Sequence, residues 1–272
     1  MVTRSHVAVA VAAFACSGTL AAAGTANRFD PKNFGAPAKG ANKWFPLKPG
    51  FQTVREGGVS RGSRRIPHIR VLTVTDVSKL INGVRTVAVL DQDFDGGQLA
   101  EQALDFVAED KQGNVWYLGS YTESYEGGQF VNAEDGWLAG LQGAKPGILM
   151  QARPRTGTPA YYQAQVPGVE SPTARVAKTG QSVCVPIKCY KGVLVIEEGS
   201  SEYKYYAPGV GHIRTEPRYS GGEQETEALI NLKFLSRRGL AELSAEALKL
   251  DRHARVTTKD VFGRSAAAKR TL

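Results

Sequence analysis

The stretch IRVLTVTDVSKLINGVRTVAVLDQDF, residues 69–94, decides the fold class of the chain. Apolar and polar residues alternate through most of it, which is the pattern of a half-buried β-strand. Near its middle, Asn82 and Gly83 tolerate the positive φ angles that a two-residue type I′ turn requires. The stretch therefore predicts two antiparallel strands joined in a hairpin.

Glycine-rich turn signals continue after this hairpin at intervals of about ten residues. They are DGGQ (95–98), KQGN (111–114) and EGGQ (126–129). The alternating segments between and after them are LAEQALDFVAED (99–110), VWYLGSYTESY (115–125) and FVNAEDGWLAG (130–140). With 30 glycines and 13 prolines in the whole chain, this spacing indicates an antiparallel meander.

Residues 140–162 interrupt the alternation with three prolines and four glycines, which predicts a long connection of the kind that forms lids and binding loops. A second group of β segments follows between residues 173 and 235. Because neither half clearly carries a core of its own, we expect one sheet rather than two domains. The predicted fold class is mainly β, an antiparallel meander over residues 43–235 that forms a curved sheet or partly open barrel, with one C-terminal helix.

The composition changes after Gly239 to LAELSAEALKLDRHAR (240–255). Leu240, Leu243, Ala247 and Leu250 fall on one helical face. Residues 236–255 are therefore predicted to form a helix that packs on the sheet. A basic flexible tail is expected to follow over residues 256–272.

Residues 1–26 have the features of a secretory signal peptide, because an early arginine precedes an apolar run that ends in small residues. Cleavage is expected after Ala23 or Ala26, and polar interruptions in the apolar run favour export over a transmembrane helix. In a second interpretation, the chain is cut before Cys16 and lipidated there. In both, the mature chain is expected to be secreted or to lie in the periplasm or cell envelope, without a transmembrane span.

The formal charge falls from +8 to +7 when Arg4 leaves with the signal peptide. A charge of this size serves solubility or association with an anionic envelope surface, and both interpretations stay open. The densest basic segment is REGGVSRGSRRIPHIR (55–70), which we expect to be a solvated loop. Because it lacks interleaved aromatic residues and any nucleic-acid motif, no nucleic-acid partner is expected.

Cys184 and Cys189 are separated by Val-Pro-Ile-Lys, and Pro186 suits the first central position of a turn. The two cysteines can therefore face each other across a hairpin, and export favours a disulfide between them. A redox-active pair is the alternative, but such a pair usually has two intervening residues and stands at a helix start.

Four ordered motifs give the chain a resemblance to other proteins. They are FPLKPG (45–50), DKQGNVWYLG (110–119), GAKPGILM (143–150) and YYAPGVG (205–211), within residues 43–216. On these motifs the chain resembles a group of uncharacterised exported bacterial β-rich proteins. The resemblance implies a β-rich fold and export, and it brings no catalytic residues.

The segment DQDFDGG (91–97) places Asp91, Asp93 and Asp95 at alternate positions, as in the first half of a calcium-binding loop. On an extended strand, however, Asp91 and Asp95 would lie ~13 Å apart, too far for one ion. We therefore expect a hairpin tip with the three aspartates in solvent. The alternative is a calcium site in which the chain curls and a distant carboxylate, Glu123 or Glu126, completes the ligand set.

Aromatic residues supply the candidate ligand-binding surface. The candidates are Trp116, Tyr117, Tyr121, Tyr125, Tyr203 and Tyr205. In strict alternation, Tyr203 and Tyr205 share one face of a strand, and stacked tyrosines of this kind suit a sugar or an apolar ligand. Core and cross-strand packing explain the same pattern, and that alternative stays open.

Groups for catalysis are sparse. His68, His212 and His253 each stand alone in the sequence, and we expect them to be solvent-facing or hydrogen-bonded. A zinc site would need either all three histidines or acidic partners brought together by the fold.

The predicted function is an exported non-catalytic binding or envelope-associated protein, which holds an apolar small molecule or a glycan on the concave sheet face beneath residues 140–162. One alternative is an extracellular hydrolase whose acidic site pairs Glu197 or Glu198 with Asp105 or Glu109. A structural surface protein without a pocket is the other. No catalytic residue is identified and no cofactor is firmly implied, calcium being the ion that the sequence suggests.

Overall fold

The computed structural model describes residues 28–35, 40–133, 136–199, 201–219 and 224–271. The predicted signal peptide, its cleavage sites and Cys16 lie outside the described residues. The first group of strands is β1 (Phe51–Arg61), β2 (Arg64–Ile81), β3 (Val84–Asp95), β4 (Gln98–Glu109), β5 (Val115–Glu126), β6 (Gln129–Asn132), β7 (Trp137–Leu138) and β8 (Lys145–Met150). The second group is β9 (Tyr161–Tyr162), β10 (Ala164–Gln165), β11 (Thr173–Val185), β12 (Lys188–Glu198), β13 (Glu202–Ala207), β14 (Gly211–Pro217) and β15 (Gln224–Phe234). The chain ends with helix α1 (Arg237–Thr257), a 3₁₀ turn η2 (Phe262–Arg264) and strand β16 (Lys269–Arg270), and a further 3₁₀ turn, η1 (Pro31–Asn33), precedes β1.

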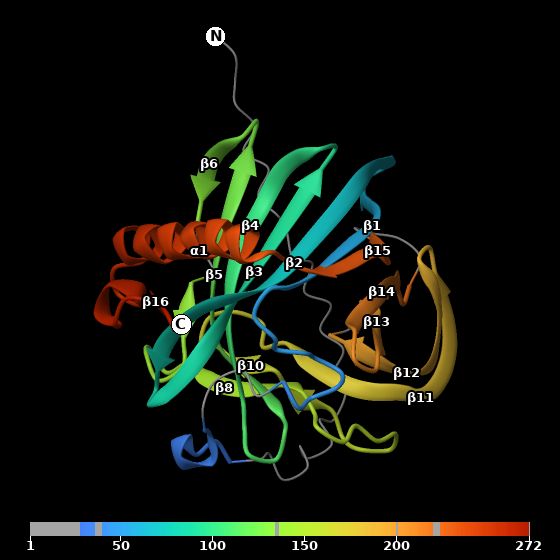
Figure 1. Ribbon diagram of the computed structural model, residues 1–272, viewed down its shortest axis with the longest axis horizontal. Coiled ribbons are helices and arrows are strands. Elements are labelled where there is room, and N and C mark those ends of the chain that lie inside the picture. Colours follow the sequence, from blue (N-terminus) through green and yellow to red (C-terminus); the bar gives the residue numbers. More distant parts are fainter. Residues whose placement is uncertain (1–27, 36–39, 134–135, 200, 220–223, 272) are drawn as a thin grey trace.

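The described strands form one antiparallel sheet, which confirms the predicted fold class. The order of neighbouring strands is β10-β8-β5-β4-β3-β2-β1-β15-β14-β13-β12-β11-β9. β9 and β10 stand at opposite ends of this order, although Gln163 alone separates them in the sequence. The sheet therefore curls until its two ends almost meet, and Figure 1 shows β2–β5 on one side of the molecule and β11–β14 on the other.

The hairpin predicted over residues 69–94 is present as β2 and β3. Asn82 and Gly83 have φ angles of 46° and 79°, as a type I′ turn requires. The next turns also lie where the glycine signals placed them, between β3 and β4, β4 and β5, and β5 and β6.

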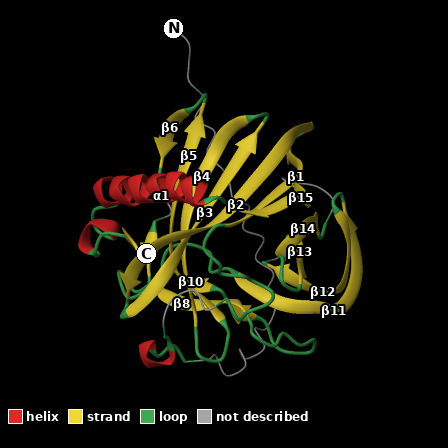
Figure 2. Cartoon of the chain, viewed as in Figure 1, coloured by secondary structure: helices red, strands yellow, loops and turns green. Residues whose placement is uncertain are grey.

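The sheet has two buried faces. On the outer face, Leu90, Phe106 and Leu118 pack with Leu250 of α1 and with Phe262. Figure 2 shows α1 lying across the sheet on this side. On the inner face, which the curled sheet encloses, one cluster joins residues of β3, β4 and β8 to residues of β11, β12 and β13. The predicted helix is confirmed, and its N-terminus is capped by Ser236, whose side chain accepts a hydrogen bond from the Gly239 amide.

The segment after α1 differs from the expected flexible tail. β16 pairs with β2, with Lys269 opposite Ser78 and Arg270 opposite Val77. The register between β2 and β3 shifts between Val74 and Ser78, so β2 has backbone groups there that β3 does not reach. Arg270 also donates to the buried Asp76 carboxylate, with Nε–Oδ1 at 3.0 Å. The bulge and the buried charge of Asp76 hold the C-terminal segment in place.

The arginine-rich segment 55–70 also differs from the expectation of a solvated loop. It forms most of the β1–β2 hairpin. Arg55 is only 2% exposed and donates to Glu227 of β15. A Cβ at Gly57 would lie 1.7 Å from the carbonyl oxygen of Thr226, so β1 approaches β15 where it lacks a side chain. The segment is therefore a pair of strands with a buried arginine rather than a solvated loop.

Residues 140–162 are more regular than predicted, because they contain β8, which pairs with β5. Conversely, the predicted strand 130–140 divides into β6 and β7. Cys184 and Cys189 lie directly opposite each other in the β11–β12 register and form the expected disulfide. No helix in the described part of the chain has the length and apolar character that a membrane crossing requires.

Candidate functional site

Polar side chains gather in two places on the curled sheet. The first, the outer groove, is lined by Thr156, Gly157, Thr158, Pro159, Ala160, Tyr161, Tyr162, Thr173, Arg175, Val176, Ala177, Lys178, Glu197 and Tyr203. The second, the inner charge cluster, lies within the curl and consists of Arg55, His68, Arg70, Asp91, Asp93, Asp95, Glu225 and Glu227.

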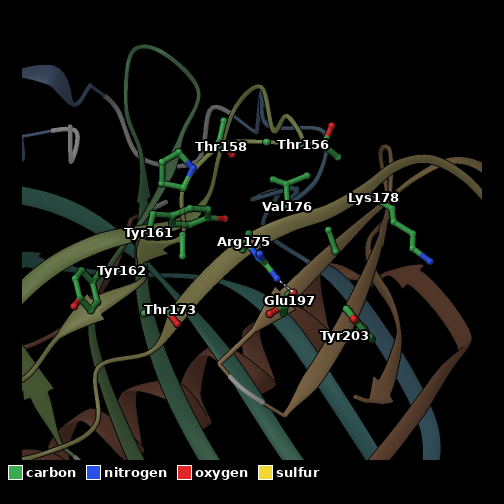
Figure 3. Close-up of a pocket in the computed structure, with 14 residues that line it drawn as sticks. Thr156, Thr158, Tyr161, Tyr162, Thr173, Arg175, Val176, Lys178, Glu197 and Tyr203 are labelled. Carbon is green, nitrogen blue, oxygen red and sulfur yellow. Dashed lines mark hydrogen bonds and ion pairs between the residues drawn. The ribbon is translucent and has the colours of Figure 1, made fainter. Parts of the chain in front are cut away.

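The outer groove has a volume of about 1120 Å³ and lies between the loop 156–160 and one face of β11–β13. Strand register builds its floor, because Arg175, Glu197 and Tyr203 stand opposite one another across three neighbouring strands. Thr173, two residues before Arg175, lies on the same face and pairs with Tyr162 of β9. The result is a row that runs from one tyrosine to another (Figure 3).

Charges in the groove are held by ion pairs. Glu197 accepts from Arg175 at 2.6 Å through one carboxylate oxygen and pairs with Arg218 at 2.6 Å through the other. The Arg218 guanidinium also lies 5.4 Å from the ring centroid of Tyr203. Glu197 is therefore an acceptor fixed between two arginines, and Arg175, 53% exposed, keeps donors that face the groove.

The loop that covers the groove ends in Tyr161 and Tyr162, whose side chains point to opposite faces of the sheet. Tyr162 is 37% exposed and lies on the groove side. Tyr161 stands opposite the buried Ala174, and its ring packs with the inner core. Burial raises the pKa of Tyr161, and its hydroxyl has no hydrogen-bond partner. Tyr161 therefore anchors the loop, while Tyr162 presents a ring to the groove.

The six predicted ligand-binding aromatics are not brought together. Tyr203 lines the groove, and Tyr205, two residues along β13, donates to Glu216 instead. Trp116 packs with Phe29 and Phe34 and donates to Asp110 at 2.8 Å.

Of the other three predicted aromatics, Tyr117 and Tyr121 pack in the sheet cores, and Tyr125 packs against Phe130. Tyr117 donates to the half-buried Asp105 at 2.5 Å. Tyr121 and Tyr125 both donate to Glu123, close to helix α1. The packing alternative accounts for their positions.

The expectation that Asp91, Asp93 and Asp95 face solvent is wrong. They lie on the inner face of the curled sheet, where β2 supplies cationic partners. Arg70 Nε lies 3.0 Å from Asp91 and 3.2 Å from Asp93, and His68 Nδ1 lies 2.8 Å from Asp95. The three aspartates therefore do not converge on one calcium ion. Glu123 bonds to tyrosines beside α1 instead of approaching them.

Burial shapes the electrostatics of the inner charge cluster. It raises the pKa of Asp93 and of Glu225, and neighbouring carboxylates raise both further. For Glu227, burial is opposed by the guanidinium of Arg55, which holds the pKa of that carboxyl well below its usual range. The cluster thus mixes a firmly ionised carboxylate with two that resist ionisation.

The carboxylates suggested for a hydrolase have separate roles. Glu197 faces the outer groove, whereas Glu198 accepts from Lys204 and Tyr206 on the opposite face of β12. Asp105 accepts from Tyr117 and Ser120, and Glu109 accepts from backbone amides of residues 41 and 42. Among the described residues that line the outer groove, Glu197 is the only carboxylate.

Two of the histidines have ordinary partners. His212 is half-buried and bonds to Thr215 and to the Arg214 carbonyl oxygen, and desolvation lowers its pKa well below the usual value. His253 of α1 bonds to Glu123 at 2.5 Å. His68 differs, because the fold surrounds it with carboxylates.

Sequence reasoning missed the threonines of the loop, Arg175 and Tyr162 as members of a groove. It also missed Glu225 and Glu227 as neighbours of His68. The available signal was charge at alternate positions in three segments, 68–70, 91–95 and 225–227. Only the pairing of β1 with β15 and β2, and of β2 with β3, shows that the charged residues of these three segments share one face of the sheet.

No family model and no curated protein matches the chain. Among solved structures, it is similar to a candidate lipoprotein of Parabacteroides distasonis ATCC 8503, at 15% sequence identity and a TM-score of 0.39. It is also similar to a candidate exported protein with a YmcC-like fold from Bacteroides fragilis NCTC 9343, at 14% identity and a TM-score of 0.34. Each comparison covers 71% of this chain and 99% of the other. These values are too low to assign a family or a function.

Proposed function

We propose that the protein is an exported binding protein of the cell envelope and that its outer groove holds a glycan. The row from Tyr162 through Thr173 and Arg175 to Tyr203 carries the proposal. Sugars present apolar C–H faces and a fringe of hydroxyl groups. Tyrosine rings suit the former, and fixed polar side chains suit the latter.

The shape of the two sheet faces supports a glycan over an apolar molecule. The outer groove is open and lined with hydroxyl groups, including those of Thr156 and Thr158 (Figure 3). On the enclosed side, the cavity beside Phe45, Leu72 and His212 measures only about 30 Å³, room for one or two water molecules. Side chains fill the concave face, so the proposed ligand site lies on the opposite face from the one expected.

The groove supports binding better than glycoside hydrolysis. Hydrolysis by the usual route needs two carboxyl groups ~5 to 9 Å apart on either side of the bond that is cut. Glu197, the acidic residue described in the groove, is fixed by Arg175 and Arg218. That arrangement suits a hydrogen-bond acceptor for a sugar hydroxyl.

Export rests on the sequence. The signal-peptide features of residues 1–26 support it, and a disulfide between Cys184 and Cys189 suits an oxidising compartment.

The proposal is tested by calorimetric titration of the mature chain with a panel of neutral and uronic-acid-containing oligosaccharides. Tyr162→Ala should weaken binding of the best panel member by about fivefold, because one aromatic contact contributes about 1 kcal/mol. Phe234→Ala is the matched control, since Phe234 is an exposed aromatic outside the groove. Equal affinity for both variants, or no binding to any member of the panel, would refute a glycan site in the groove.

A further inference from the structure

The inner charge cluster contains an arrangement that the proposed function does not use. His68 of β2 is 3% exposed, and its Nε2 has no hydrogen-bond partner. Around Nε2 lie three carboxylate oxygens, at 3.8 Å from Glu227 and at 3.9 Å from both Glu225 and Asp93. Asp93 Oδ1, one of these oxygens, is also buried and forms no hydrogen bond, although Arg70 Nε lies 3.2 Å from it. The separations from His68 Nε2 are too long for hydrogen bonds.

We propose that His68, Glu225 and Glu227 bind a divalent first-row transition-metal ion, with Asp93 as a further ligand. In a tetrahedral zinc site, bonds of ~2.0–2.1 Å place the ligand atoms about 3.3 Å apart. The ligand atoms of the three main residues lie within 4.8 Å of one another, so small side-chain rotations bring them to that spacing.

The second ring nitrogen of His68, Nδ1, has a carboxylate partner that orients the imidazole for metal binding. His68 Nδ1 lies 2.8 Å from Asp95 Oδ1. When Nδ1 carries the proton and donates it to Asp95, Nε2 holds a lone pair directed at the three carboxylates. A carboxylate that orients a histidine in this way is the usual second partner of a metal-binding imidazole.

The charge around the site leaves room for a dication. Four carboxylates contact the guanidinium groups of the cluster, those of Asp91, Asp93, Glu225 and Glu227. Arg55 and Arg70 supply two positive charges against these four. Arg70 Nη1 lies 3.4 Å from Glu227 and 3.5 Å from Glu225, longer than a close charge-assisted bond. Together with these two arginines, an ion of charge +2 balances all four carboxylates once it has displaced the protons that Asp93 and Glu225 retain in its absence.

Ligand chemistry selects the class of ion. An imidazole nitrogen together with carboxylate oxygens suits zinc and its neighbours, whereas calcium and magnesium prefer oxygen ligands alone. The site is reached from solvent at Glu225, whose side chain is 22% exposed. This assignment differs from the calcium loop considered from the sequence, because it uses only Asp93 of those three aspartates as a ligand.

The test uses the mature chain without an affinity tag, stripped with a chelator and titrated with zinc chloride by calorimetry. We expect one zinc ion per chain and an X-ray absorption spectrum with one imidazole nitrogen among oxygen ligands. Glu225→Gln keeps the side-chain volume and should weaken zinc binding at least tenfold. Asp95→Asn should weaken it by about 10- to 100-fold through loss of the orienting contact.

His253→Gln is the matched control, because His253 also bonds to a carboxylate but lies on α1, away from the cluster. It should bind zinc like the wild type. His68→Gln should abolish binding; if that variant does not fold, Glu225→Gln and Asp95→Asn decide the question. Absence of stoichiometric zinc, unchanged affinity in both of these variants, or displacement of zinc by an equal concentration of calcium would overturn the assignment.

Discussion

Glu198 shows how single residues keep charge inside the curled sheet. Its carboxylate lies 2.8 Å from Lys204 Nζ and accepts from Tyr206 at 3.0 Å and from Gln163 at 3.3 Å. Burial by itself would raise the pKa of Glu198, but Lys204 and these hydrogen bonds hold it below the ordinary value. The ionised form is therefore favoured by the folded state.

This arrangement predicts acid-dependent stability. Because the pKa of Glu198 is lower in the folded than in the unfolded chain, its contribution is complete above the unfolded value of about 4.3 and is lost as the pH falls through the folded value. Between pH 6 and pH 3, the melting temperature of the wild type should fall more steeply than the melting temperature of Glu198→Gln. Parallel curves for the two proteins would show that Glu198 does not carry this dependence.

At the scale of elements, β16 ties the chain end to the sheet. Lys79, which is 1% exposed, donates to Asp251 of α1 at 2.7 Å and to the Ala266 carbonyl oxygen at 2.7 Å. Asp251 in turn accepts from the Ala268 amide at 2.9 Å. The segment before β16 thus satisfies buried polar groups of both α1 and β2.

Removal of residues 266–272 should therefore destabilise the fold. Each buried polar group left without a partner costs about 1–3 kcal/mol, and in a domain of this size 1 kcal/mol lowers the melting temperature by roughly 2–4 °C. Lys269→Ala in the full chain, which removes an exposed charge and keeps the pairing, should melt like the wild type. Equal melting temperatures for the truncated and full chains would contradict the anchoring role of this segment.

The sequence predicted most elements but not this one. Asn82-Gly83 and the paired glycines are local turn signals, so the hairpins around them were accessible without a structure. β16 pairs with the part of β2 where the register with β3 shifts, almost two hundred residues earlier in the chain. No local sequence pattern predicts this pairing. The prediction of a solvated loop for the arginine-rich segment failed for a related reason, because only the pairing of β1 with β15 brings Glu227 to Arg55.

At the scale of the whole molecule, the curl of the sheet produces both candidate sites. β9 and β10 lie in one short stretch of chain but close opposite ends of the sheet. Because the two ends of the sheet lie close together, the inner charge cluster is enclosed, and the loop 156–160 lies over the outer face of β11. Long-range register determines which strand faces become neighbours. The sequence therefore predicted a curved sheet and a loop over it, but it placed the ligand on the concave face, opposite to the face of the outer groove.

Hydrogen–deuterium exchange of the mature chain tests whether a glycan binds in the outer groove. With the best-binding oligosaccharide of the panel, amides of residues 156–162 and 173–178 should exchange more slowly, because these segments form the loop and one edge of the groove. Amides of the β2–β3 hairpin provide an internal reference. Slower exchange in residues 156–162 and 173–178 is the predicted result. Saturated binding without any change in these residues would contradict a glycan site in the outer groove.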